Sequence, residues 1–195
     1  MIKSKNWWLI LNADKLVIGL TGMPGAGKSL VIKCVQKSGY AVVSMGDVIR
    51  EETSKRGLAL NSENVGKVML ELRAIGGENV VAEKCIPKIE AKQDSTILID
   101  GIRSYAEVEV FSKHFSKFVL IAVHASPQTR FSRLASRGRS DDPTSLEIFN
   151  DRDMREINVG IGKAIALSKY IIINDDTIET LNERAKQVIE RAEQK

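Results

Sequence analysis

Aromatic residues are scarce in this chain, at 5% of its 195 residues. Proteins that bind single-stranded nucleic acid without sequence preference stack the bases on aromatic side chains. The composition therefore disfavours such a groove, and we expect no nucleic-acid partner. The net charge is +4, from 29 basic and 25 acidic residues. An excess this small suits an anionic small molecule as well as RNA, so it does not identify the substrate.

Cysteine is also rare, and the two that are present, Cys34 and Cys85, lie far apart in the sequence. Neither has a second cysteine or a histidine at the spacing of metal ligands. We expect two reduced, buried thiols in a cytoplasmic protein. A disulfide between them would require the fold to bring the two together. His114 and His124 have no evident partner in the sequence, and we expect both to be structural.

Long apolar runs are missing as well. No window approaches the ~18 apolar residues of a membrane span, so we expect no membrane partner. Lys3 and Lys5 precede a short apolar run at residues 7–11, which faintly resembles a signal peptide. Polar residues follow that run, where a signal peptide would need small residues for cleavage. We expect residues 1–14 to be an extension outside the core fold, or the product of an upstream translation start that the natural protein does not use.

What the chain does contain, from residue 16 onward, is an alternation of short apolar runs and helix-like segments. The runs predicted to be buried strands are residues 16–21, 40–44, 96–100, 118–124 and 170–174. The segments predicted to be helices are residues 28–37, 47–56, 61–91 with a break at Gly76-Gly77, 126–136, 144–168 with an irregularity around Gly160 and Gly162, and 177–194. Apolar strands separated by helices predict an α/β fold, with a parallel sheet covered on both faces.

No linker or internal repeat is evident, so we expect one domain over residues 15–195. Residues 46–90 are predicted to be a helical insertion between the second and third strands. Residues 137–143 form a short polar loop. Residues 144–147 match the capping-box pattern, which predicts that the next helix opens there.

The segment from Gly22 to Ser29 matches the phosphate-loop pattern G-x-x-x-x-G-K-[ST], between a predicted strand and a predicted helix. Its members are Gly22, Met23, Pro24, Gly25, Ala26, Gly27, Lys28 and Ser29. Small residues let successive backbone N–H groups curl around a phosphate, and the helix N-terminus adds a favourable dipole. We expect the loop to bind ATP, with Lys28 reaching the β- and γ-phosphates and the Ser29 hydroxyl binding Mg²⁺.

Asp100 ends the third predicted strand, as the acidic residue of a Walker-B-type strand does. At that position its carboxylate could hold the magnesium ion through water. Alternatively, Asp100 caps a helix that begins near Ser104. The sequence leaves both interpretations open.

The chain resembles the adenylate-kinase-like nucleotide kinases over most of residues 16–180. The matching segments are Gly46-Asp47-Val48-Ile49-Arg50, Asp100-Gly101-Ile102-Arg103, Arg133-Leu134-Ala135-Ser136-Arg137 and Arg139-Ser140-Asp141-Asp142. More closely, the chain resembles an uncharacterised archaeal family described as adenylate-kinase-related, and more distantly dephospho-coenzyme A kinase. The resemblance implies a three-layer P-loop kinase fold with strand order 2-3-1-4-5. It also implies that residues 46–90 bind the acceptor and residues 137–143 form a short lid.

The roles of the site residues follow from this resemblance and from the affinity of arginine for phosphate. Arg50 and Arg103 are expected to bind the acceptor's phosphate. The arginines expected to close over the phosphates of ATP are Arg133, Arg137 and Arg139. Asn174 is expected near the donor adenine. Asp47 either handles the proton of an acceptor hydroxyl or caps the following helix.

Two departures from the kinase pattern concern the acceptor. The Asp-Gly-x-Arg segment is one residue shorter than in those kinases. Glu107 stands where they commonly place a glutamine that reads adenine. A carboxylate can accept a hydrogen bond from the adenine amino group but cannot donate one.

The favoured function is therefore an ATP-dependent phosphotransferase acting on a nucleoside monophosphate such as AMP. A nucleotide-binding regulatory or assembly ATPase without efficient transfer is the alternative, and the short lid motivates it because poor exclusion of water wastes ATP by hydrolysis. An RNA-associated ATPase ranks last, because aromatics are few. The oligomeric state is not predicted.

Overall fold

The computed structural model describes residues 15–138 and 142–194. The predicted N-terminal extension (residues 1–14) and the predicted donor-site residue Arg139 lie outside the described residues. In the part that is described, no helix combines the length and the apolar character needed to cross a membrane.

A five-stranded parallel sheet organises the molecule. Its strands are β1 (Leu16–Thr21), β2 (Ala41–Ser44), β3 (Thr96–Asp100), β4 (Lys117–His124) and β5 (Tyr170–Ile173). They are arranged in the order β2-β3-β1-β4-β5, and every neighbouring pair is parallel. The predicted fold class and strand order are confirmed.

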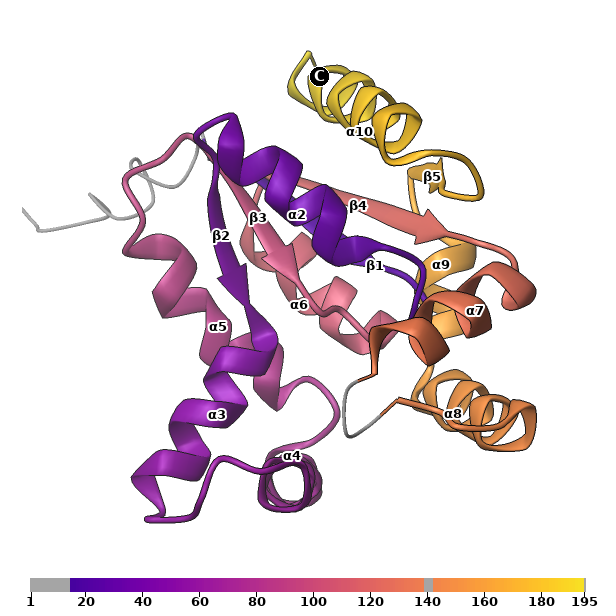
Figure 1. Ribbon diagram of the computed structural model, residues 1–195. Coiled ribbons are helices and arrows are strands. Elements are labelled where there is room, and N and C mark those ends of the chain that lie inside the picture. Colours follow the sequence, from indigo (N-terminus) through magenta and orange to yellow (C-terminus); the bar gives the residue numbers. More distant parts are fainter. Residues whose placement is uncertain (1–14, 139–141, 195) are drawn as a thin grey trace, which may run out of the picture.

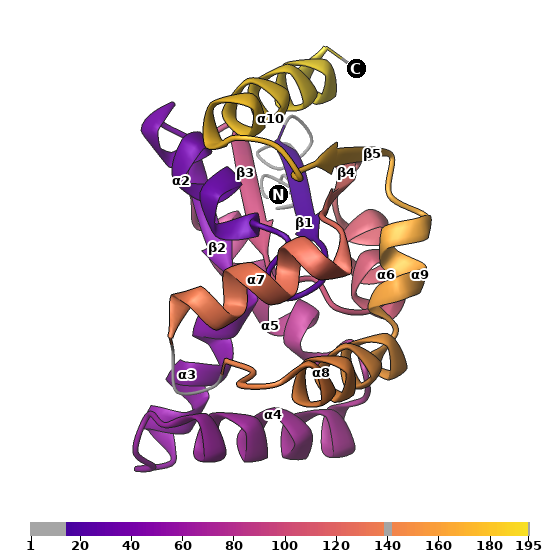
Figure 2. The same ribbon diagram turned by 45° about the vertical axis from the view of Figure 1, so that its right-hand side comes forward.

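Helices cover both faces of this sheet (Figures 1 and 2). They are α2 (Lys28–Lys37), α3 (Met45–Lys55), α4 (Ser62–Gly76), α5 (Val80–Glu90), α6 (Tyr105–His114), α7 (Pro127–Arg137), α8 (Leu146–Val159), α9 (Ile161–Ala166) and α10 (Ile178–Glu193). α2 and α10 pack together on one face, and α5, α6 and α9 lie on the other. α3, α4, α7 and α8 gather at the edge where the strands end (Figure 2).

The strands are buried on both sides because successive side chains point to opposite faces. Val17 and Ile97 lie in the core beneath α5 and α6, whereas Ile18 and Leu98 lie in the core beneath α2 and α10. Burying an aliphatic side chain of this size stabilises the fold by roughly 1.5–3 kcal/mol. This two-sided burial explains why the strands are apolar throughout rather than alternating.

Glu107 is the buried junction between the helical insertion and the rest of the fold. Its carboxylate accepts hydrogen bonds from the backbone N–H groups of Arg103 (2.8 Å) and Ser104 (3.2 Å). Its other oxygen accepts from Nη2 of Arg73 in α4, at 2.9 Å. Glu107 is fully buried and forms a capping box with Ser104 at the start of α6. Glu107 stands where the resembling kinases commonly place a glutamine that reads adenine. In this protein its carboxylate instead joins α4, α6 and the segment before α6.

Several helix starts differ from the sequence expectations. Ser44 is the N-cap of α3, so Asp47 lies inside the first turn and does not cap that helix. Ser104, not Asp100, caps α6. The capping box expected over residues 144–147 is wrong, because α8 begins one residue later, with Ser145 as the cap. In each case, the residue whose backbone is extended next to the helix provides the cap.

Cysteine and histidine environments were only partly predictable. Cys34 and Cys85 are free and buried, as expected. They belong to helices on opposite faces of the sheet, so no disulfide can join them. His114, for which the sequence showed no partner, has its Nε2 2.8 Å from a carboxylate oxygen of Glu90. Glu90 comes from α5, and only the packing of α5 against α6 brings it there.

The junction at Glu107 predicts a large effect of one substitution on stability. Glu107→Gln presents an amide N–H₂ to neighbours that are all donors, and it leaves Arg73 without its counter-charge. We expect the free energy of unfolding to fall by about 2–4 kcal/mol, as for other broken buried ion pairs. Urea denaturation followed by circular dichroism measures this. Glu109→Gln, on the exposed side of the same helix, should change it by less than about 0.5 kcal/mol. Equal stability of the two variants would contradict the role of the junction.

Candidate functional site

The candidate site lies at the carboxyl ends of the parallel strands, where α/β proteins commonly bind ligands. β1 ends at Thr21, the phosphate loop follows, and α2 begins at Lys28. In the sheet, Leu20 of β1 lies opposite Asp100 at the end of β3. The parallel register therefore places the phosphate loop beside the predicted metal carboxylate.

Two glycines in the loop have backbone conformations and surroundings that exclude a side chain. Gly22 has φ 142°, and a Cβ there would lie 2.2 Å from the carbonyl oxygen of Val123. Gly27 has φ 100°, and a Cβ there would lie 2.1 Å from Nδ2 of Asn174. The glycine pattern seen in the sequence thus reflects close approach to β4 and to the end of β5, as well as the turn itself.

Asn174, which follows β5, binds the phosphate loop through a side-chain hydrogen bond. Its side-chain N–H donates to the carbonyl of Ala26 at 2.8 Å, and its backbone N–H donates to the carbonyl of His124 at 2.7 Å. Arg133 of α7 donates to the carbonyl of Asn174 at 2.8 Å. The Asn174 residue is only 2% exposed. Its buried side chain contacts the loop, so its effect on a nucleotide would pass through the loop rather than through the adenine.

Lys28 is the charged side chain of the loop itself. Its Nζ donates to the carbonyl of Gly22 and, at 3.2 Å, to that of Met23. Burial lowers the pKa of Lys28 to about 8, and the Asp100 carboxylate opposes that shift. The ammonium is therefore held inside the loop.

Asp100 is the carboxylate around which the predicted residues gather. Burial raises its pKa, and the nearby positive charges of Lys28 and Arg103 oppose the rise. Asp47 and Arg50 are also close enough to act on its charge. These residues come from three separate segments of the chain, and the fold brings their charges into one site.

Three of the arginines expected to bind phosphate have carboxylate partners. Arg50 pairs with Asp47 at 2.6 Å, Arg103 with Glu156 at 3.0 Å, and Arg137 with Asp142. Arginine binds carboxylate and phosphate with the same planar geometry. The protein thus holds these guanidinium groups with acidic groups of its own.

Three residues of this site were missed by the sequence analysis, namely Arg130, Asp153 and Glu156. Arg130 is buried, pairs with Asp153 through Nη1 at 2.8 Å, and donates from the same atom to the carbonyl of Pro24 at 3.2 Å. Its guanidinium also lies 4.9 Å from the centroid of the Phe149 ring. The helical spacing of Arg130 with Arg133, which places both on one face of α7, was the available signal.

The residues present fit a magnesium ion that a nucleotide brings with it. Ser29 is exposed at the first turn of α2, and Asp100 ends β3. No group of three acidic, histidine or cysteine side chains that could hold a metal by itself occurs among the described residues. Mg²⁺ commonly uses one or two protein oxygens together with phosphates and water, which matches this sparse set.

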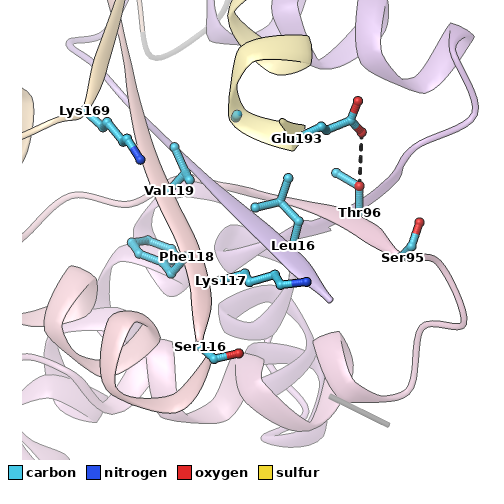
Figure 3. Close-up of a pocket in the computed structure, with 10 residues that line it drawn as sticks. Leu16, Ser95, Thr96, Ser116, Lys117, Phe118, Val119, Lys169 and Glu193 are labelled. Atoms are coloured by element: carbon cyan, nitrogen blue, oxygen red, sulfur yellow. Dashed lines mark hydrogen bonds between the residues drawn. The ribbon is translucent and has the colours of Figure 1, made fainter. Parts of the chain in front are cut away.

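Two hollows differ in their relation to this site. One, of about 410 Å³, lies beside α3 and is lined by Asp47, Arg50 and Leu60, among others. Another, of about 330 Å³, lies at the amino ends of the strands, where Leu16 begins β1 (Figure 3). Thr96 and Glu193 line it, and the Thr96 hydroxyl donates a hydrogen bond to the Glu193 carboxylate (Figure 3). The second hollow is at the wrong end of the sheet for a ligand of the phosphate loop.

Comparison with known proteins gives matches over most of the chain. A family model described as an AAA domain matches residues 21–150. A UPF0200 protein of Thermococcus onnurineus is 44% identical over 180 residues, which are 90% of this chain and 97% of that protein. A UPF0200 protein of Methanocaldococcus jannaschii is 48% identical over 166 residues, 84% of each chain.

Among solved structures, shikimate kinase from Bacteroides thetaiotaomicron superposes with a TM-score of 0.64, covering 90% of this chain and 98% of that one. Its sequence identity of 17% makes this a likeness of fold alone. The match nevertheless agrees with the sheet order and the phosphate loop described above. The chain belongs to the UPF0200 family and has a P-loop kinase-like fold.

Proposed function

We propose that the protein transfers the γ-phosphoryl group of ATP to a phosphorylated acceptor, with AMP as the first candidate. The observation that carries the proposal is the gathering of Lys28, Arg50 and Arg103 around Asp100. The loop that holds Lys28 suits the triphosphate of the donor. Arg50 lines a separate hollow, which suits the phosphate of a second molecule.

On the donor side, the backbone N–H groups of residues 22–27 and the ammonium of Lys28 would bind the β- and γ-phosphates. Ser29 and Asp100 would hold Mg²⁺, which, when bound, neutralises part of the phosphate charge. Arg137 would close over the triphosphate, together with Arg139. Arg133 is already bound to the carbonyl of Asn174 and would steady the loop.

On the acceptor side, Arg50 and Arg103 would bind the acceptor phosphate and align it with the γ-phosphoryl group. Transfer between phosphates depends mainly on this alignment and on positive charge near the moving group. An acceptor that is itself a phosphate needs no general base, so Asp47 would serve to orient Arg50. Its 2.6 Å ion pair with that arginine supports this role.

The buried state of Glu107 bears on which acceptor is used. Both oxygens of its carboxylate already accept hydrogen bonds from Arg73, Arg103 and Ser104. Glu107 is also fully buried, so its carboxylate cannot reach the amino group of a bound adenine unless this junction opens. AMP is proposed for its phosphate, and the choice of base has to be tested across a panel of nucleotides.

Coupled detection of ADP across nucleoside monophosphates, dephospho-coenzyme A and small hydroxyl acceptors tests the proposal. Lys28→Ala should lower turnover at least about 100-fold, because a preorganised positive charge is lost from the transferring group. Arg50→Ala should chiefly raise the KM for the acceptor. Lys33→Ala, an exposed lysine on α2, serves as the control. ATP binding without turnover on any acceptor, and phosphate release unaffected by Lys28→Ala, would instead support the regulatory ATPase.

The lowered pKa of Lys28 gives a pH-dependent prediction. Because this pKa is about 8 in the free protein, Lys28 is charged at pH 7 and loses its charge as the pH rises through 8. Bound triphosphate favours the charged form, so ATP affinity should weaken by up to about tenfold per pH unit above 8. Titration of a fluorescent ATP analogue between pH 7 and 9.5 measures this. A slope that persists unchanged in Lys28→Ala would contradict the assignment.

Asn174 should affect ATP affinity without contacting the nucleotide. Asn174→Ala removes the donor to the Ala26 carbonyl and leaves space beneath the loop. Loss of one buried hydrogen bond costs roughly 1–2 kcal/mol, so ATP should bind about tenfold more weakly. Isothermal titration calorimetry checks this value. Gln187→Ala, exposed on α10, should leave the affinity unchanged. An unaltered affinity in Asn174→Ala would show that the loop holds its shape without this bond.

A further inference from the structure

The helix α8 carries two acidic side chains one turn apart, Asp153 and Glu156, and each pairs with an arginine of the site. Asp153 pairs with the buried Arg130, which also binds the carbonyl of Pro24 in the phosphate loop. Glu156 pairs with Arg103, which belongs to the loop after β3. α8 is thus connected both to the donor loop and to an acceptor arginine.

We propose that Glu156 is a positioning residue that sets the direction of Arg103 and moderates its charge, so that it controls how tightly the acceptor phosphate binds. This inference rests on the proposed function, because it assigns Arg103 to the acceptor. Neither the sequence pattern nor the family resemblance assigned a role to Glu156. The family model also ends at residue 150, before Glu156.

The exposure of the two partners supports this role. The Glu156 side chain is 12% exposed, whereas the Arg103 side chain is 47% exposed. The carboxylate is therefore largely shielded from solvent, while part of the guanidinium stays open to an incoming anion. Since a guanidinium has five N–H donors, Arg103 can keep its bond to Glu156 and still bind a phosphate.

The backbone of Arg103 is also fixed, which leaves its side chain as the adjustable part. The Arg103 N–H donates to the buried Glu107 carboxylate at 2.8 Å. Two residues earlier, Gly101 has φ 98°. The N–H of Ile102, between them, donates to the carbonyl of Leu20 at 3.3 Å. With the chain held on both sides, the ion pair to Glu156 decides where the guanidinium points.

The negative charge of Glu156 also interacts with Lys28 of the phosphate loop. Its negative charge raises the pKa of Lys28, opposing the effect of Arg103 on the same ammonium. The charge of Glu156 is therefore felt at the phosphate loop. Removing its charge should strengthen anion binding there.

The pair between Asp47 and Arg50 provides a contrast. Both of its side chains are more than half exposed, at 57% and 51%. Exposed pairs contribute little and yield easily to a competing anion. The shielded carboxylate of Glu156 has fewer waters available to replace Arg103, so it should hold that arginine more firmly.

The experiment is a calorimetric titration of AMP into the full-length wild type, Glu156→Gln and the matched control Glu147→Gln. Glu147 is exposed in the first turn of the same helix. We expect AMP to bind Glu156→Gln about fivefold more tightly than the control, because one negative charge beside Arg103 is lost while a hydrogen-bond acceptor is kept. Thermal unfolding of each variant is measured in parallel.

Orientation is tested separately through turnover. Glu156→Ala should also tighten AMP binding but lower kcat about tenfold, because Arg103 is no longer aimed. Glu156→Asp restores the charge and should recover AMP affinity close to that of the wild type. A purely structural role would lower the melting temperature of these variants without tightening AMP binding.

The outcomes separate this inference from the proposed function. AMP affinity in Glu156→Gln that is equal to or weaker than in Glu147→Gln overturns the inference, whatever the turnover. AMP binding to neither protein also overturns it, even if another acceptor is phosphorylated. Tighter binding in Glu156→Gln without turnover on any acceptor supports the inference and defeats the proposed transfer alone. Should Glu156→Gln fail to fold, Glu156→Ala takes its place, and AMP affinity equal to or weaker than in Glu147→Gln overturns the inference.

Discussion

Parallel pairing between β1 and β3 is the constraint on which the site depends. It sets Leu20 opposite Asp100, and the contact continues beyond the strands. The N–H of Ile102 donates to the Leu20 carbonyl, and the Thr21 hydroxyl donates to the Ile102 carbonyl at 2.9 Å. These bonds hold the segment after β3 against the base of the phosphate loop. A slip of this register would separate Lys28 from Asp100 and dismantle the charge cluster.

Charge in the site is balanced rather than uniformly positive. Arginine side chains aimed at phosphate would repel one another if left alone, and acidic partners from α3, α8 and the segment before α8 reduce that repulsion. The consequence is that an incoming phosphate has to compete with the protein's own carboxylates. Shielded partners such as Glu156 compete more strongly than exposed ones such as Asp47. Under the proposed function, affinity for the acceptor would thereby be adjustable through residues that do not touch it.

Much of the fold was predictable because its signals are local. The apolar runs mark strands buried on both faces, and the phosphate-loop pattern fixes the strand–loop–helix order around Lys28. Glu107 and Asn174 show where local signals end. Glu107 stands where the resembling kinases commonly place a glutamine that reads adenine, and Asn174 was expected near the donor adenine. In the structure, both side chains are buried and hold backbone groups. A polar residue that binds the base and one that braces the loop have the same appearance in a single sequence.

The sequence by itself determined the α/β class, the phosphate loop and the identity of the charged residues near it, because each rests on residue type and short-range spacing. Only the tertiary structure decided which charges pair. Arg103 and Glu156 are 53 residues apart, and Arg73 and Glu107 are 34 apart. Such partners meet because helices from distant parts of the chain pack at one edge of the sheet. Sequence spacing does not predict these ion pairs, because they depend on how the buried faces of the helices fit together.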